Sequence, residues 1–276
     1  MRRAPESAVT VSSCRQEGGR RALSPLAAVA PLVSIIVVVF RAQRELSSLL
    51  KSIFAVERRE VEVIVIDGGS GDGTVELLRK WSDRIDYWLS EPDTGIYNAM
   101  NKGLAAATGH YVLHLNAGDA LRVIPSDALH QCLAAEIDVV CCRVRLDDSV
   151  TFCPRNGPRM LIENAWHHQG TFYRRLGHPG YDETYRVFGD FDLNQKLAKR
   201  RKSIRFLNDI VADHHDNGIS VSGRKSNCPE VWRSVRSNSG IVFVPIAFAW
   251  YKLYFVRRWI ATFRRLIARQ VSSPVR

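Results

Sequence analysis

The chain has 276 residues, of which 46% are hydrophobic, so it can bury a core and is not a wholly disordered protein. Its formal net charge of +11 is concentrated at the ends: residues 1–30 carry five Arg and two Glu, and residues 241–276 carry six Arg, one Lys and no acidic residue. The remaining residues, 31–240, have a net charge of +1, and such a nearly neutral body argues against nucleic acid as a partner.

The first segment, residues 1–30, is rich in Ser, Arg, Gly and Ala without periodicity, so we expect a disordered leader. Pro25 and Pro31 interrupt its apolar stretch, which runs directly into a strand pattern. A cleaved signal peptide is therefore not expected.

The next part of the chain alternates between strand and helix patterns. Continuous β-branched runs at 32–40 and 61–66 are typical of strands buried on both faces of a parallel sheet. Shorter strands are expected at 85–89 and 111–115, and helices at 43–55, 74–81 and 96–109. The alternation predicts a doubly wound α/β sheet. Ligands bind such sheets at the carboxyl ends of the strands, here in the loops at 40–41, 67–73, 90–95 and 116–119.

The second half of the chain is less regular. We expect a β-hairpin of residues 137–146 and 150–153, a strand at 170–174, a helix at 189–199, strand and loop over 204–216, and a further helix at 225–237.

The C-terminal segment changes character again. Residues 241–256 are almost wholly apolar, but Pro245 and Lys252 interrupt them, so the run is short for a membrane span. Residues 257–269 place aromatic and aliphatic side chains on one helical face and arginines on the other. A basic amphipathic helix of this kind is typical of a segment that lies in a membrane surface. The alternatives are a helix packed on the domain with solvated arginines, and a true span.

Five sequence blocks follow one another at a characteristic spacing. They are VSIIVVVF at 33–40, VIVIDGGSGDGT at 63–74, SEPDTGIYNAMNKGLAAATGHYVLHLNAGD at 90–119, HHQGTFYRR at 167–175 and YDETYRVFGDFDLNQKL at 181–197. Together they resemble the family 2 glycosyltransferases of the GT-A fold, in particular those of colanic-acid, exopolysaccharide and glycolipid biosynthesis. The resemblance implies a GT-A domain over 31–225, with a mostly parallel central sheet covered by helices on both faces, followed by a helical, basic segment over 226–276.

The resemblance also implies a pocket for a nucleotide-sugar. Asp67 would bind the nucleobase or ribose, and Phe40 would line the same pocket; Asp93, Asn101 and Lys102 would line the nucleotide-sugar side of the cleft. The residue types suit this chemistry, because a carboxylate at a strand end accepts hydrogen bonds and a lysine offers a point charge to a diphosphate. Without the resemblance, a capped turn at Asp67 and a solvated lysine at 102 would be ordinary alternatives.

Residues 116–119 (Asn-Ala-Gly-Asp) occupy the place of the family's Asp-x-Asp metal motif, which implies a divalent cation, Mg²⁺ or Mn²⁺. This sequence departs from the pattern, because Asn116 replaces one carboxylate and Gly118 stands where another often occurs. Asp119 is the carboxylate that remains. For His214 there are two alternatives, a ligand beside Asp119 and an ordinary loop residue.

Inverting transfer also needs a base that removes the proton of the acceptor hydroxyl. By position in the family, Asp190 is that base, provided that burial raises its pKa, whereas Asp192 is a structural partner. Read without the family, both aspartates would be helix caps. His168 and Gln169 are expected to line the acceptor cleft.

The resemblance therefore implies an inverting glycosyltransferase that moves a sugar from a nucleotide-diphospho-sugar to an acceptor hydroxyl. Among such donors, a UDP-sugar is the first expectation. The basic C-terminal segment favours a peripheral position on the inner face of the cytoplasmic membrane, with a lipid-linked glycan as acceptor. The six cysteines lack Cys-x-x-Cys spacing and fit a reducing cytoplasm. The alternatives are a degenerate protein that binds nucleotide or glycan without catalysis, and a binder of nucleic acid or another anionic surface.

Overall fold

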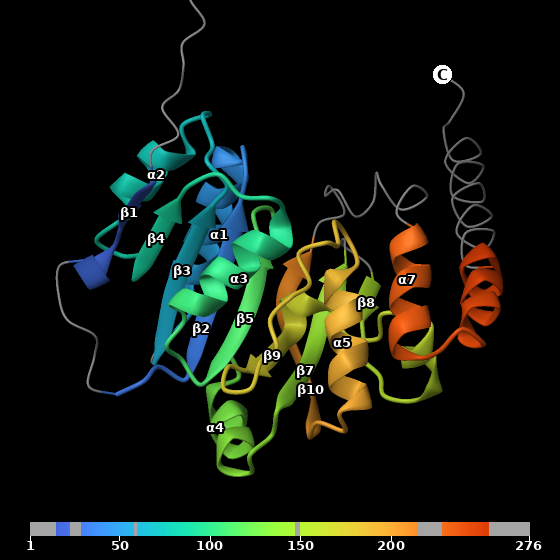
Figure 1. Cartoon of the computed structure of the whole chain (residues 1–276). Coiled ribbons are helices and arrows are strands. Elements are labelled where there is room, and N and C mark those ends of the chain that lie inside the picture. The colour runs from blue at the N-terminus through green and yellow to red at the C-terminus, as the bar shows by residue number, and fades with distance from the viewer. Residues whose placement is uncertain (1–14, 23–28, 58–59, 147–149, 215–227, 254–276) are drawn as a thin grey trace, which may run out of the picture.

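The computed structural model describes residues 15–22, 29–57, 60–146, 150–214 and 228–253, which form a mixed α/β domain around one ten-stranded sheet (Figure 1). The strands are β1 Gln16–Gly18, β2 Val33–Val39, β3 Val61–Asp67, β4 Tyr87–Ser90, β5 Tyr111–Asn116, β6 Ala120–Leu121, β7 Val139–Leu146, β8 Val150–Phe152, β9 Thr171–Arg174 and β10 Ile204–His214. The helices are α1 Gln43–Ala55, α2 Thr74–Lys80, α3 Ile96–Ala106, α4 Ser126–Ala134, α5 Gly189–Lys199 and α7 Cys228–Asn238.

The sheet has the strand order β1-β4-β3-β2-β5-β9-β7-β10-β6, and β8 pairs with β7. Its first half is a parallel block of β4, β3, β2 and β5. Beyond β5, the strand β9 runs antiparallel to both of its neighbours, and β7 and β10 are again parallel. The continuous β-branched runs therefore form central strands buried on both faces, as their composition predicts.

Helices cover both faces of the sheet (Figure 1). Because side chains alternate along a strand, Ile35 of β2 packs in the core with α1, α2 and α4, whereas Ile36 packs in the core with α3 and α5. The predicted arrangement of a mostly parallel sheet with helices on both faces is confirmed. Within the described residues, the predicted elements of the second half are confirmed as well, with shifts of up to two residues at their ends, but α4 and β6 were not foreseen. The predicted residues 215–216 and 225–227 lie outside the described residues.

The expectation of disorder across residues 1–30 is wrong for residues 15–22. Strand β1 pairs antiparallel with β4 at the edge of the sheet, and a short 3-10 turn follows at Arg20–Ala22. The side chain of Arg21 then reaches into the body of the domain, where it contacts the buried carboxylate of Glu62 and donates to the carbonyl oxygen of Ala106 at 2.6 Å. Residues 1–14 and 23–28 lie outside the described residues.

Glu62 is the centre of a buried network at the amino ends of the parallel strands. Besides Arg21, it accepts hydrogen bonds from the hydroxyls of Ser34 and Thr108 and from the backbone N–H groups of Thr108 and Gly109. A buried carboxylate is stable only when it is paired and hydrogen-bonded. The residues of this network therefore join the N-terminal arm to β2, β3 and the loop that precedes β5.

The C-terminal part of the described chain packs against α5. Val231 and Val235 of α7 form a small core with Phe191 of α5 and Ile162, and helical residues 243–253 add Ala247 to it. Within the described residues, no helix has the length and apolar character that crossing a membrane requires. The predicted amphipathic helix at 257–269 lies outside the described residues.

Replacing Arg21 by Ala should lower the free energy of unfolding by about 3 kcal/mol, because the carboxylate of Glu62 would remain buried without its cation. Urea denaturation followed by circular dichroism measures this loss. The control is His130→Ala, which removes an exposed contact with Glu60 and should cost less than about 0.5 kcal/mol. Equal losses in the two variants would contradict the anchoring role of Arg21.

Candidate functional site

The site lies at the carboxyl ends of the parallel strands. The register places Val39 beside Asp67, Asp67 beside Ser90, and Val38 beside Asn116, so the last residues of β2, β3, β4 and β5 share one edge of the sheet. The loops that the sequence analysis singled out therefore do meet, as parallel pairing requires.

Asp67 is fully buried beneath this edge rather than exposed on it. One of its carboxylate oxygens accepts hydrogen bonds from the backbone N–H of Ser70 at 2.9 Å and from the hydroxyl of Ser90 at 2.6 Å. The other oxygen accepts from the hydroxyl of Ser70 at 2.5 Å. Asp67 therefore fixes the glycine-rich loop after β3 to the end of β4, and its predicted contact with a nucleobase or ribose stays a prediction.

Phe40, Gly68 and Asp93 meet at a tight corner of the same edge. A Cβ atom on Gly68 would lie 2.5 Å from Oδ2 of Asp93 and 3.2 Å from Cδ2 of Phe40, so a side chain there would displace the carboxylate of Asp93. Phe40 is 55% exposed at this edge, and the guanidinium of Arg41 lies 5.0 Å from the centroid of its ring. Burial raises the pKa of Asp93 above its usual value, against the hydrogen bond from the N–H of Gly95 and the charge of Lys102.

Two of the residues predicted on the donor side, Lys102 and Asn101, have their polar groups bound to other residues of the protein. The side chain of Lys102 lies 2.8 Å from a carboxylate oxygen of Glu91 and donates to the carbonyl oxygen of Pro92 at 3.0 Å. The amide of Asn101 bonds to both the N–H and the carbonyl oxygen of Tyr181 and to Glu183. These contacts give no support to donor binding by Asn101, whose amide joins α3 to residues 181–183. The predicted charge of Lys102 for a diphosphate stays a prediction.

The place of the metal motif is built from Asn116, Asp119 and His214. One carboxylate oxygen of Asp119 accepts a hydrogen bond from the backbone N–H of Asn116, and the other lies 2.7 Å from Nδ1 of His214 at the end of β10. Among the described residues, Oδ1 of Asn116 is a buried acceptor without a hydrogen-bond partner. His214 therefore lies beside Asp119, which is the position that a metal ligand at this residue would need.

These donors fit a divalent cation, because a carboxylate, an amide oxygen and an imidazole are all ligands that Mn²⁺ accepts and oxygen ligands suit Mg²⁺. The protein side is sparse, since no group of three or more His, Cys, Asp or Glu side chains within the described part of the chain is arranged to hold a metal. Such sites are commonly completed by water and by the phosphates of a bound substrate.

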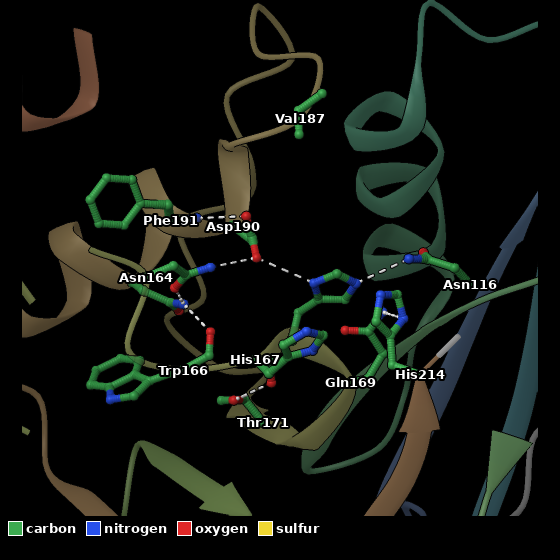
Figure 2. A network of polar contacts seen from close by, with 12 residues as sticks. Asn116, Asn164, Trp166, His167, Gln169, Thr171, Val187, Asp190, Phe191 and His214 are labelled. Carbon is green, nitrogen blue, oxygen red and sulfur yellow. Dashed lines mark hydrogen bonds and ion pairs between the residues drawn. The ribbon is translucent and has the colours of Figure 1, made fainter. Parts of the chain in front are cut away.

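Asp190 lies at the start of α5 and faces Asn116 across the same network of polar contacts (Figure 2). Its Oδ2 accepts a hydrogen bond from the side-chain amide of Asn164 at 2.8 Å and lies 3.3 Å from Nδ1 of His168. Its Oδ1 accepts from the backbone N–H of Phe191 at 2.8 Å. The carboxylate is nearly buried and is held in place by three donors.

The expectation that burial raises the pKa of Asp190 is wrong in its outcome. Burial does push the pKa of Asp190 upwards, but the hydrogen bonds from His168 and from the backbone N–H of Phe191 favour the ionised carboxylate and outweigh it, so the pKa of Asp190 falls below its ordinary value. Asp190 is therefore ionised at neutral pH. The neighbouring Asp192 accepts hydrogen bonds from Tyr185 and Asn238, as a structural partner would.

The residues at 167–169 contact different parts of the site. His168 stands between Asp190 and Asn116, with Nε2 lying 3.2 Å from Nδ2 of Asn116. Gln169, predicted on the acceptor side, is instead fully buried with its amide 3.1 Å from Nδ1 of His214. His167 is partly buried, with its ring centroid 5.7 Å from that of His168 and 5.0 Å from that of His214, and burial lowers the pKa of His167 to about 3, so it is neutral.

Two residues of the site were not predicted from the sequence. Asn164, which donates to Asp190, comes from a segment without a motif or a regular element, so no local pattern marks it. Ser90, which donates to Asp67, could have been found, because it ends the strand next to β3.

Comparison with known proteins identifies relatives of this chain. A "PGL/p-HBAD biosynthesis glycosyltransferase" of Mycobacterium bovis (strain BCG / Pasteur 1173P2) is 29% identical over 210 residues, which is 68% of this chain and 78% of that protein. An uncharacterized glycosyltransferase of Mycobacterium tuberculosis (strain ATCC 25618 / H37Rv) is 44% identical over 91 residues, but this match covers only 33% of the chain and 35% of that relative.

Solved structures share the fold. The mannosyltransferase PcManGT from Pyrobaculum calidifontis, in complex with GDP-Man and Mn²⁺, superposes on 90% of this chain and 77% of its own, with a TM-score of 0.59 and 20% identity. S. aureus TarS 1-349 in complex with UDP matches 75% of this chain and 64% of its own, with a TM-score of 0.56 and 18% identity. The GT-A fold expected from the sequence is thereby confirmed.

The family model described as "Glycosyl transferase family 2" matches residues 34–195, from the first residues of β2 to the middle of α5. This span is more than half of the chain and contains Asp67, Asp119 and Asp190. On this evidence, the chain belongs to glycosyl transferase family 2.

Proposed function

We propose that this protein is an inverting glycosyltransferase that moves one sugar from a nucleotide-diphospho-sugar to an acceptor hydroxyl, with Asp190 as the base. One observation carries the proposal. An ionised, nearly buried carboxylate on α5 is joined through His168 to Asn116, in the loop where the family places its metal motif. Acceptor activation and donor binding would thus share one continuous site.

In the proposed reaction, the donor lies along the carboxyl ends of β2 to β5. Phe40 offers its exposed ring to the base, and Asp67 holds the loop on which the nucleoside rests. The acceptor oxygen attacks the anomeric carbon from the face opposite the leaving diphosphate, and its proton passes to the carboxylate of Asp190. The fixed position of Asp190 supplies orientation, because three donors hold its two oxygens.

Asp119, with His214 and Oδ1 of Asn116, would hold a Mg²⁺ or Mn²⁺ ion on the donor side. When bound, such an ion neutralises the charge that develops on the diphosphate. The Mn²⁺ of the Pyrobaculum calidifontis structure supports a divalent ion here. UDP in the TarS structure and GDP-Man in the other support a nucleoside-diphosphate sugar, with a UDP-sugar as our first choice.

A lipid-linked glycan at the inner face of the cytoplasmic membrane is the acceptor that we propose, in the assembly of cell-surface polysaccharide or glycolipid. The turn after α7 exposes Ile241 by 67% and Val242 by 71%, and Phe248 is also exposed. Because residues 241–276 carry seven basic residues and no acidic one, this apolar turn sits in a segment suited to anionic lipid.

Exchanging Asp190 for Asn should reduce turnover about 10²- to 10⁴-fold, since the amide cannot take the proton of the acceptor. Release of nucleoside diphosphate is measured with UDP- and GDP-sugars, Mg²⁺ or Mn²⁺, and a membrane lipid extract. The control is Asp127→Asn on the exposed start of α4, which should leave turnover unchanged. Turnover that survives in Asp190→Asn would refute the choice of base. Nucleotide binding without turnover in the wild type would favour the degenerate, binding-only alternative.

A methyl group at position 68 should weaken nucleotide binding about tenfold, because the Cβ atom would push Asp93 and Phe40 apart. Titration calorimetry of Gly68→Ala with UDP and GDP in the presence of Mn²⁺ measures the effect. Gly71→Ala is the matched control, since a Cβ atom there meets nothing within 4 Å. If Gly68→Ala bound UDP and GDP as tightly as the wild type and Gly71→Ala do, Gly68 would not be part of the donor pocket.

The double variant Ile241→Asp/Val242→Asp should bind vesicles of anionic phospholipid at least about tenfold more weakly than the wild type, since two apolar side chains would no longer enter the lipid. Cosedimentation with the vesicles gives the affinity. Leu176→Asp changes an equally exposed leucine, 78% accessible, in the loop after β9 and should have no effect. A loss of binding shared by both variants would argue against the turn as the membrane contact.

A further inference from the structure

His168 touches both halves of the site. Its Nδ1 lies 3.3 Å from Oδ2 of Asp190 at the start of α5, and its Nε2 lies 3.2 Å from Nδ2 of Asn116 at the end of β5. Figure 2 shows Asp190 and Asn116 on opposite sides of the network, and the two contacts of His168 join them. The ring is thus the one direct link between the proposed base and the metal-motif loop among the described contacts.

The two partners determine which nitrogen carries the proton. An ionised carboxylate is only an acceptor, so Nδ1 of His168 must be the donor towards Asp190. In the neutral imidazole, Nε2 is then an acceptor and needs a donor opposite it. The side-chain NH₂ of Asn116 supplies that donor. The Nδ1–H tautomer is the neutral form that satisfies both contacts.

The same contacts determine how the amide of Asn116 is turned. Since its NH₂ group faces Nε2 of His168, its Oδ1 is left as the acceptor of this side chain, buried and without a hydrogen-bond partner in the described part of the chain. An aspartate at this position, as in the family pattern, would set an acceptor against the lone pair of Nε2. In the neutral form with the proton on Nδ1, the amide of Asn116 supplies the donor that Nε2 needs, whereas an aspartate would instead require an imidazolium that donates to both carboxylates.

We propose that His168 is a positioning residue that holds Asp190 and Asn116 in one arrangement through its Nδ1–H tautomer. The amide at position 116 is then the partner that this histidine requires, and it presents its oxygen to the donor side. This inference rests on the proposed function in one respect: the arrangement is useful because base and donor act on the same sugar.

The tautomer is tested first, without any use of activity. Long-range ¹H–¹⁵N spectra of the full chain labelled with ¹⁵N-histidine, recorded at alkaline pH, show which ring nitrogen bears the proton. The resonances of His168 are assigned by their loss in His168→Gln. A proton on Nδ1 is the expected result. A proton on Nε2, or an imidazolium that persists at this pH, would overturn the proposal, because either form removes the need for a donor at Asn116.

The coupling is then measured in a double-mutant cycle of His168→Phe and Asn116→Leu, with thermal unfolding as the check on folding. Each single variant should lower kcat by about 10- to 100-fold, and the double variant should be no slower than the slower single one. Effects that multiply would mean that the two residues act separately and would overturn the coupling. A wild type without donor-dependent turnover would refute the proposed function instead, while the spectra still decide the tautomer.

Discussion

The parallel pairing of β4, β3, β2 and β5 is the constraint on which the site depends. Parallel strands that start in register also end together, so the side chains that follow them are delivered to a single edge. At the opposite end of these strands, the buried carboxylate of Glu62 joins β3 to β2 and to the loop before β5 through hydrogen bonds. The strand register and the hydrogen bonds of Glu62 together determine the positions of Asp67 and Asn116.

The second half of the chain completes the site in a different way. Strand β9 runs antiparallel between β5 and β7, so the segment just before it, residues 167–170, lies beside the end of β5. Helix α5 then brings Asp190 within reach of His168, and β10 brings His214 to Asp119. Residues that are far apart in sequence meet here because of topology, and the chemistry of each depends on its partner. Asp190 shows this directly, since its burial and its neighbours push its pKa in opposite directions.

Much of the first half of the fold can be predicted from the sequence, because buried parallel strands and amphipathic helices each leave a periodic pattern. Position after a strand was enough to place Asp67 and Asp119 at one edge. The pattern does not say what a side chain does there: Asn101 and Asp67 carry polar groups that the protein itself uses. Nor could the sequence place Gln169 near His214, or Asn164 near Asp190, because both contacts depend on the non-local crossing of β9, β10 and α5.

Strand β1 has a consequence for the solubility of the protein. It is three residues long and covers the outer edge of β4, where Gly18 allows the ring of Trp88 to approach to within 2.8 Å of the position that a Cβ atom would take. Without this arm, β4 would present its unpaired N–H and C=O groups beside Trp88 and Leu89, and an open edge of this kind is a template for pairing with a second sheet. By covering this edge, the arm that Arg21 anchors also prevents pairing between two copies of the chain. A chain that starts at residue 31 would be prone to aggregate through β4 even where its core still folds.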